Sequence, residues 1–145
     1  MRSPARVGIV GSGVISRAYA ANAAAFDTFE IVACADVEPA RCETLAVEHA
    51  LEALSVEDLL ASPSIDIVLN LTPPLAHLAV TRAAIEAGKH VYSEKPLAIT
   101  GAEAAELVRF AEEQGKRIGC APDIFLGRAY QTARALLDEG AIAVR

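Results

Sequence analysis

Short apolar runs alternate with longer segments of helical periodicity along this chain of 145 residues. The apolar runs predict strands over residues 6–10, 30–36, 51–54, 65–71, 90–93 and 117–120, of which 51–54 has the weakest pattern. The other segments predict helices over residues 14–25, 38–50, 55–62, 75–87, 100–115 and 126–139. Regular alternation of strand and helix is typical of a parallel sheet. We therefore expect an α/β fold, a doubly wound parallel sheet with helices on both faces.

Length and composition limit the class of protein. A chain of this length forms one domain with a single core. Its apolar runs are shorter than the roughly 18 to 20 residues of a membrane-spanning helix, and residues 1–6 lead into a strand without the apolar stretch of a signal peptide. We expect a soluble cytoplasmic protein with no membrane partner. The net charge of −6, without a basic cluster, argues against nucleic-acid binding.

The three cysteines are Cys34, Cys42 and Cys120. Their number is odd and their spacing wide, so the pattern predicts neither a disulfide framework nor a C-x-x-C metal site. We expect them to be buried small apolar residues, and we expect no bound metal.

The segment VGIVGSGVIS, residues 7–16, places glycines between the first predicted strand and the first predicted helix. One glycine suits a tight turn, and the next lets the backbone approach a ligand at a helix N-terminus, where free N–H groups favour an anion. Ser16 takes the third position of the G-x-G-x-x-G pattern, where its small side chain should fit. We predict that this turn holds the pyrophosphate of a dinucleotide through five residues: Gly11, Ser12, Gly13, Val14 and Ile15.

Asp36 supplies the second part of this pattern. It lies at the end of the second predicted strand, about 20 residues after the glycines, as the pattern requires. A carboxylate there accepts hydrogen bonds from the ribose of NAD and repels the 2′-phosphate of NADP. The alternatives are an ordinary strand–helix junction and an aspartate that only caps the next helix. Because both parts occur together, we predict a Rossmann fold that binds NAD, with NADP less favoured.

Two more segments follow predicted strands and so fall at the same carboxyl edge of the sheet, where nucleotides bind. Thr72 and Pro73 would border the nicotinamide ribose there. His77 has two interpretations, a place at the cofactor rim or an inert histidine in the first turn of a helix. Lys95 follows the next strand, where an amine beside a cofactor can hydrogen-bond the reacting oxygen of a substrate and share in proton transfer. A solvated surface lysine is the alternative.

Five segments, in order and spacing, resemble the glucose-fructose oxidoreductase, inositol dehydrogenase and rhizopine-catabolism oxidoreductase family: VGIVGSGVIS, IVACAD, LTPPLAH, AGKHVYSEKPLA and RALLDEGAIA. The Glu-Lys-Pro block is the most specific of them. The resemblance implies that Lys95 is catalytic and contacts substrate and cofactor, that Glu94 lies by the nicotinamide ribose, and that the peptide bond before Pro96 is often cis. It places three more residues at the cofactor rim: Thr72, Pro73 and His77.

Two short segments depart from the family's pattern. Pro74 stands where many relatives have asparagine, which puts one side-chain contact near the cofactor in doubt. The sequence PDIFLG at residues 122–127 replaces a turn that more usually contains Arg-Phe. Within it, Asp123 has two interpretations, a contact with substrate or a helix cap.

The resemblance also implies a second α/β domain that supplies the substrate pocket and the oligomer interface, so identical copies are expected to assemble in the whole protein. We expect residues 1–122 to form the dinucleotide-binding domain and residues 123–145 a crossover helix toward that missing domain. The implied reaction is hydride transfer between nicotinamide and a sugar, polyol or related hydroxy compound, with the fragment inactive alone. The alternative is a non-catalytic nucleotide-binding module or a truncated remnant.

Overall fold

A computed structural model describes residues 3–122 and 124–142 of the chain. The two interpretations of Asp123 therefore fall outside the described residues. Within them, six parallel strands form one sheet in the order β3-β2-β1-β4-β5-β6. The strands are β1 (Ala5–Val10), β2 (Phe29–Ala35), β3 (Glu52–Leu54), β4 (Ile67–Asn70), β5 (His90–Ser93) and β6 (Ile118–Cys120). The expected doubly wound parallel sheet is confirmed.

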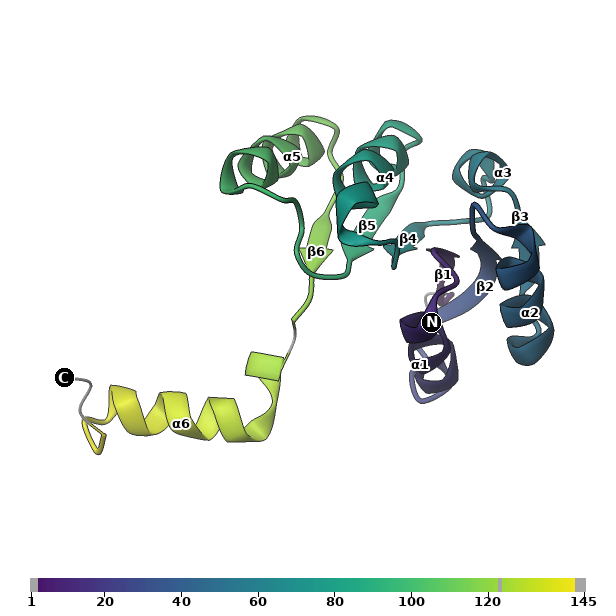
Figure 1. The fold of residues 1–145 in the computed structure, drawn as a ribbon. Helices are drawn as coiled ribbons and strands as arrows, with labels where there is room; N and C mark the ends of the chain where they lie inside the picture. The colour runs from purple at the N-terminus through teal and green to yellow at the C-terminus, as the bar shows by residue number, and fades with distance from the viewer. Residues whose placement is uncertain (1–2, 123, 143–145) are drawn as a thin grey trace.

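Helices cover both faces of this sheet (Figure 1). They are α1 (Val14–Ala23), α2 (Pro39–His49), α3 (Val56–Ala61), α4 (Pro74–Glu86) and α5 (Gly101–Glu113). A further helix, α6 (Arg128–Asp138), follows β6. One core packs α3, α4 and α5 against the sheet and includes Leu59, Ile85 and Leu107. The other packs α1 and α2 against the opposite face and includes Leu45. The order of the strands reverses at β1, so the cleft between β1 and β4 is where a doubly wound sheet binds ligands.

Local sequence signals explain where the helices begin and end. Pro39 occupies the first turn of α2, where its missing N–H has no intrahelical partner to lose. The Thr100 hydroxyl accepts a hydrogen bond from the Glu103 N–H, and the Glu103 carboxylate accepts one from the Thr100 N–H, which completes the expected capping box of α5. Gly88 follows α4 with a φ of 78°, the left-handed conformation expected after a helix.

Two expectations need correction. The helix expected over residues 126–139 begins only at Arg128, because a short 3-10 turn (η1, Ile124–Leu126) and Gly127 as N-cap precede it. The Gln131 side chain donates to the Phe125 carbonyl at 2.7 Å and so ties α6 to that turn. Cys34 and Cys42 are buried as expected, but Cys120 is only half-buried, because it ends the edge strand β6.

The last helix, α6, extends away from the sheet (Figure 1). Its apolar side chains are exposed, including Tyr130 at 55 % and Leu137 at 39 %. No helix among the described residues is long and apolar enough to cross a membrane. The same residues contain no cluster of three or more metal-ligating side chains.

Candidate functional site

The glycine turn joins β1 to α1 and is held from two sides. The Gly11 N–H donates to the Ala35 carbonyl of β2 at 2.8 Å. Gly11 has a φ of 103°, and a Cβ atom there would lie 2.6 Å from the carbonyl carbon of Leu71, so only glycine fits. Gly13 is the N-cap of α1, and a Cβ atom there would meet nothing within 4 Å. The first glycine therefore brings the turn close to β4, whereas the second leaves the helix N-terminus open.

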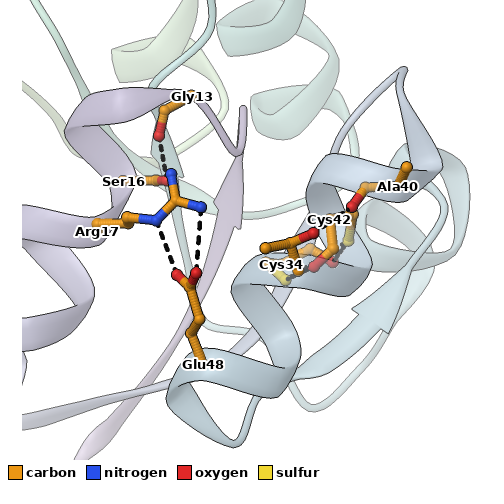
Figure 2. A network of polar contacts seen from close by, with 8 residues as sticks. Gly13, Ser16, Arg17, Cys34, Ala40, Cys42 and Glu48 are labelled. Atoms are coloured by element: carbon orange, nitrogen blue, oxygen red, sulfur yellow. Dashed lines mark hydrogen bonds and ion pairs between the residues drawn. The ribbon is translucent and has the colours of Figure 1, made fainter.

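Ser16 lies beneath this turn and is fully buried. Its hydroxyl donates to the Gly13 carbonyl at 2.6 Å, a contact that Figure 2 shows beside Arg17. The expectation that a small side chain fits the third position of the pattern is confirmed. Val14 and Ile15 point the other way, into solvent, with exposures of 89 % and 44 %.

Asp36 follows β2 and links two turns. One carboxylate oxygen accepts a hydrogen bond from the Ser12 N–H at 2.6 Å, and the other accepts one from the Glu38 N–H at 2.9 Å. The second contact orders the turn that precedes α2, but α2 has Glu38 as its N-cap and no side-chain cap hydrogen bond, so Asp36 does not cap this helix. The first contact joins Asp36 to the glycine turn, so the two parts of the sequence pattern meet in the structure.

A hollow of about 540 Å³ opens beside the glycine turn, between α1 and α2. Seven residues line it: Ser12, Gly13, Val14, Arg17, Ala40, Arg41 and Thr44. The Arg17 guanidinium donates to both carboxylate oxygens of Glu48, at 2.7 and 3.3 Å (Figure 2). This pairing lowers the pKa of Glu48 and raises the pKa of Arg17. No sequence motif pointed to the three lining residues of α2, although Ala40, Arg41 and Thr44 lie on one face of this helix.

The carboxyl ends of β4 and β5 form the second half of this edge. Asn70 pairs with Ser93 in the register of the two strands, and the Glu94 N–H donates to the Asn70 carbonyl at 2.9 Å. Thr72 follows β4, and its hydroxyl donates to the Asn70 side-chain oxygen at 2.7 Å. Thr72 and Glu94 therefore sit on neighbouring strand ends, as their positions in the sequence predict.

Glu94 accepts two hydrogen bonds, whereas the neighbouring Lys95 is exposed. The Tyr19 hydroxyl, from α1, donates to one Glu94 oxygen at 2.9 Å, and the Lys95 N–H donates to the other at 3.0 Å. The Lys95 side chain is exposed at this edge. The Lys95–Pro96 peptide bond is cis, as the resemblance implies for this proline. Pro73 is the N-cap of α4, and the ring of His77 lies buried beneath the two strand ends.

The strand order, the glycine turn at a helix N-terminus and the carboxylate at the end of the next strand define a dinucleotide-binding domain. The chain belongs to the oxidoreductase family with an NAD-binding Rossmann fold, because the sequence pattern of that family matches residues 5–121. This match confirms the resemblance drawn from the five sequence segments. It also supports NAD as the cofactor of the domain.

Curated relatives include proteins named as a reductase and as a dehydrogenase. The chain is 34% identical over 139 residues to a 1,5-anhydro-D-fructose reductase from Ensifer adhaerens, covering 94% of this chain and 42% of that protein. It is 36% identical over 117 residues to an inositol 2-dehydrogenase from Agrobacterium fabrum, covering 78% and 35%. The chain therefore spans well under half the length of these relatives.

Solved structures share the fold. A biliverdin reductase from Synechocystis, solved with biliverdin and NADP+, superposes with a TM-score of 0.82 at 33% identity, over 94% of this chain and 43% of that one. An oxidoreductase from Desulfitobacterium hafniense described as NADPH-dependent gives a TM-score of 0.90 at 21% identity, over 97% and 41%. At that identity the second likeness concerns the fold alone.

Two thiols lie together where α2 packs against β2. The sulfur atoms of Cys34 and Cys42 are 3.5 Å apart, and both residues are buried (Figure 2). Burial, and after it the neighbouring Cys42 thiol, raises the pKa of Cys34 from 9.0 to about 12. Cys34 therefore stays protonated at neutral pH and is a poor nucleophile.

This raised pKa predicts a loss of stability in alkali. The unfolded thiol ionises near its ordinary pKa of 9.0, whereas the folded thiol holds its proton until about 12, so the stabilisation is complete below pH 9 and is lost between these values. We expect the free energy of unfolding of the parent chain, relative to Cys34→Ala, to fall by up to about 1.4 kcal/mol per pH unit in that window. Urea unfolding between about pH 8 and about pH 11 measures this difference. If the free energies of unfolding of the parent chain and of Cys34→Ala changed equally with pH, the result would contradict this prediction.

Proposed function

We propose that NAD lies along the carboxyl edge of the sheet, with its pyrophosphate on the turn from Gly11 to Ile15. The observation that carries this proposal is the contact between Asp36 and the Ser12 N–H beside the open N-terminus of α1. In this arrangement the carboxylate of Asp36 accepts hydrogen bonds from the adenosine ribose, and the adenine lies in the hollow between α1 and α2. The nicotinamide end then reaches the strand ends of β4 and β5, between Thr72 and Glu94.

The residues of this edge suit the chemistry proposed for the whole protein, hydride transfer between nicotinamide and a sugar, polyol or related hydroxy compound. The bound cofactor would supply the hydride chemistry. The protein would position the cofactor against the substrate and exclude competing reactions. Lys95 carries an exposed amine that can donate a hydrogen bond to the substrate oxygen and share its proton, which makes it the proposed catalytic residue. The names of the reductase and dehydrogenase relatives support this class of substrate.

A preference for NAD over NADP is proposed from the charge of Asp36. Its carboxylate stands where an adenosine 2′-phosphate would lie, so the two negative charges repel each other. Arg41, which lines the hollow, is a candidate to offset that repulsion. Titration with NADH and NADPH, followed by nicotinamide fluorescence, tests this preference. Tighter binding of NADPH would overturn the role given to Asp36.

Gly13→Ala tests the place of the pyrophosphate. In the ligand-free chain the added methyl group meets nothing within 4 Å, so we expect the unfolding midpoint to stay unchanged. In the complex the methyl group occupies the space through which the pyrophosphate approaches the backbone. We therefore expect the affinity for NADH to fall at least about tenfold, which is about 1.4 kcal/mol. Unchanged affinity in this variant would contradict the proposed binding mode.

The second candidate is a nucleotide-binding module without turnover. It is favoured by one observation, that the family match over residues 5–121 is to an NAD-binding Rossmann fold. An assay of this chain with NAD and a panel of sugars and polyols separates the two functions. NADH binding without turnover supports the module for this chain, whereas turnover that Lys95→Met abolishes supports the enzyme.

The domain organisation and compartment are also proposals. We place the end of the dinucleotide-binding domain near residue 122 and assign α6 to a crossover toward a second domain that carries the substrate pocket and the interface between identical copies. The direction of α6 away from the sheet and its exposed apolar side chains support this assignment (Figure 1). The three free thiols suit the reducing cytoplasm.

A further inference from the structure

The ring of His77 joins the two strand ends at the nicotinamide half of the proposed site. His77 lies in the first turn of α4 and is only 1% exposed. Its Nε2 atom is 2.7 Å from the Thr72 carbonyl oxygen, and its Nδ1 atom is 2.6 Å from the Pro96 carbonyl oxygen. The first of these carbonyls follows β4, and the second belongs to the Glu94–Pro96 turn after β5. One buried side chain therefore spans both turns.

The chemistry of these two contacts restricts the state of the ring. A carbonyl oxygen only accepts, so each hydrogen bond needs a hydrogen on the ring nitrogen. A neutral imidazole carries one N–H and would leave a lone pair facing a carbonyl oxygen at 2.6 or 2.7 Å inside the protein. In either neutral tautomer the ring donates to one of the two carbonyl oxygens and lies against the other, so it links both turns.

The backbone around His77 is tied into the same turn. The Asn70 side-chain amide donates to the His77 carbonyl at 3.1 Å and to the Thr81 hydroxyl at 3.0 Å. The Asn70 side-chain oxygen accepts from the Thr72 N–H and hydroxyl. Asn70, His77 and Thr81 are at most 1% exposed. Because these buried groups are mutually satisfied, they hold α4 and the Thr72 turn in one arrangement.

The other described histidines show that this environment is particular to His77. The His90 Nδ1 atom accepts a hydrogen bond from the Arg117 backbone N–H at 3.0 Å, so that nitrogen carries no hydrogen. His49 lies half-buried in the last turn of α2. The chain therefore contains an internal reference, a histidine with an accepting nitrogen, against which the ring of His77 can be compared.

We propose that His77 is a positioning residue whose ring, held between the carbonyls of Thr72 and Pro96, sets the Glu94–Lys95 turn against Thr72 at the nicotinamide half of the site. This inference rests on the proposed function, since it assigns nicotinamide to that half. His77 touches neither cofactor nor substrate in this role. It acts through the carbonyls of Thr72 and Pro96, because these belong to the two turns whose side chains are proposed to contact cofactor and substrate.

Ring nitrogen NMR tests the hydrogen bond of the His77 ring directly. In the ¹⁵N-labelled chain we expect a ring N–H of His77 that exchanges slowly with solvent, because the ring is buried and hydrogen-bonded, and we expect the ring of His90 to lack hydrogen at Nδ1. Assignment uses single His77→Gln and His90→Gln variants. A ring N–H of His77 that exchanges as fast as an exposed one would overturn the proposal.

The affinities for NADH and for AMP, which is only the adenosine part of the cofactor, test the positioning role. We expect His77→Phe, which keeps a ring but no donor, to weaken NADH about tenfold, while the affinity for AMP, which reaches only the adenosine half, changes less than about twofold. His77→Gln retains donor capacity and should recover part of the NADH affinity; it also serves if the Phe variant does not fold. Equal losses for NADH and AMP, or no loss for either, would overturn the proposal.

The same titrations separate this inference from the proposed function. Asp36→Ala is expected to weaken both NADH and AMP, because Asp36 belongs to the adenosine half. If neither Asp36→Ala nor Gly13→Ala affects NADH, the proposed cofactor site itself fails. If both weaken NADH and His77→Phe does not, only the positioning role fails. His49→Phe is the control for a ring substitution in another helix.

Discussion

Asp36→Ala is expected to weaken NADH binding about 100-fold. The Asp36 carboxylate accepts hydrogen bonds from the Ser12 N–H at 2.6 Å and the Glu38 N–H at 2.9 Å, and in the proposed complex it also accepts from the adenosine ribose. A hydrogen bond to a charged group contributes about 1.5 to 3 kcal/mol, and loosening of the glycine turn adds to the loss. A total of about 3 kcal/mol corresponds to about 100-fold in affinity.

The measurement is a fluorescence titration with NADH, with Asp27→Ala as the matched control. Asp27 is exposed before β2, so its removal changes the net charge equally without touching the glycine turn. Asp36→Asn should give an intermediate loss, because the amide nitrogen cannot accept and one of the two backbone N–H groups loses its partner. A loss below about threefold for Asp36→Ala would show that the adenosine ribose lies elsewhere.

Gly11→Ala has the largest expected effect on stability. The added Cβ atom would lie 2.6 to 2.7 Å from backbone atoms of Leu71 and Thr72, and the φ of 103° is strained for any residue with a side chain. Relief requires the turn after β1 to move away from the turn after β4, at the centre of the sheet. We expect a destabilisation of more than about 4 kcal/mol, a large share of the roughly 5 to 15 kcal/mol that stabilises a typical domain.

Urea unfolding measures this effect, and Gly101→Ala is the matched control. Gly101 is the first residue of α5, and a Cβ atom there meets nothing within 4 Å, so the control should be as stable as the parent chain or slightly more stable. Gly11→Ala with a loss below about 1 kcal/mol would mean that the two turns separate easily. The comparison with Gly13→Ala then distinguishes the glycine that the fold needs from the glycine that the cofactor needs.

Much of the fold follows from short-range patterns. The alternation of apolar and helical segments predicted every strand of the sheet and the helices that connect the strands. Capping signals such as Thr100 with Glu103 predicted the start of α5. The start of α6 was missed by two residues. Its first turn is set by Gly127 and by the bond from Gln131 to Phe125, which the apolar periodicity of the segment does not reveal.

The candidate site divides in a similar way. The glycine turn and Asp36 were predicted, because a dinucleotide requires these residue types at these strand ends. The lining of the hollow by Arg41 and Thr44 was not predicted, because it depends on how α2 lies against α1. For His77 the sequence left two interpretations open, and the structure adds a third, a ring between two carbonyls.

The amino-acid sequence by itself determined the parallel α/β architecture, the place of the glycine turn after β1 and the carboxylate at the end of β2. Each of these depends on conformational preferences of a few neighbouring residues or on a pattern read along one strand and helix. The tertiary structure alone decided that Asp36 meets Ser12, 24 residues away, and that His77 meets Pro96, 19 residues away. Such contacts depend on strand order and register, which bring separate strand ends together at one edge of the sheet.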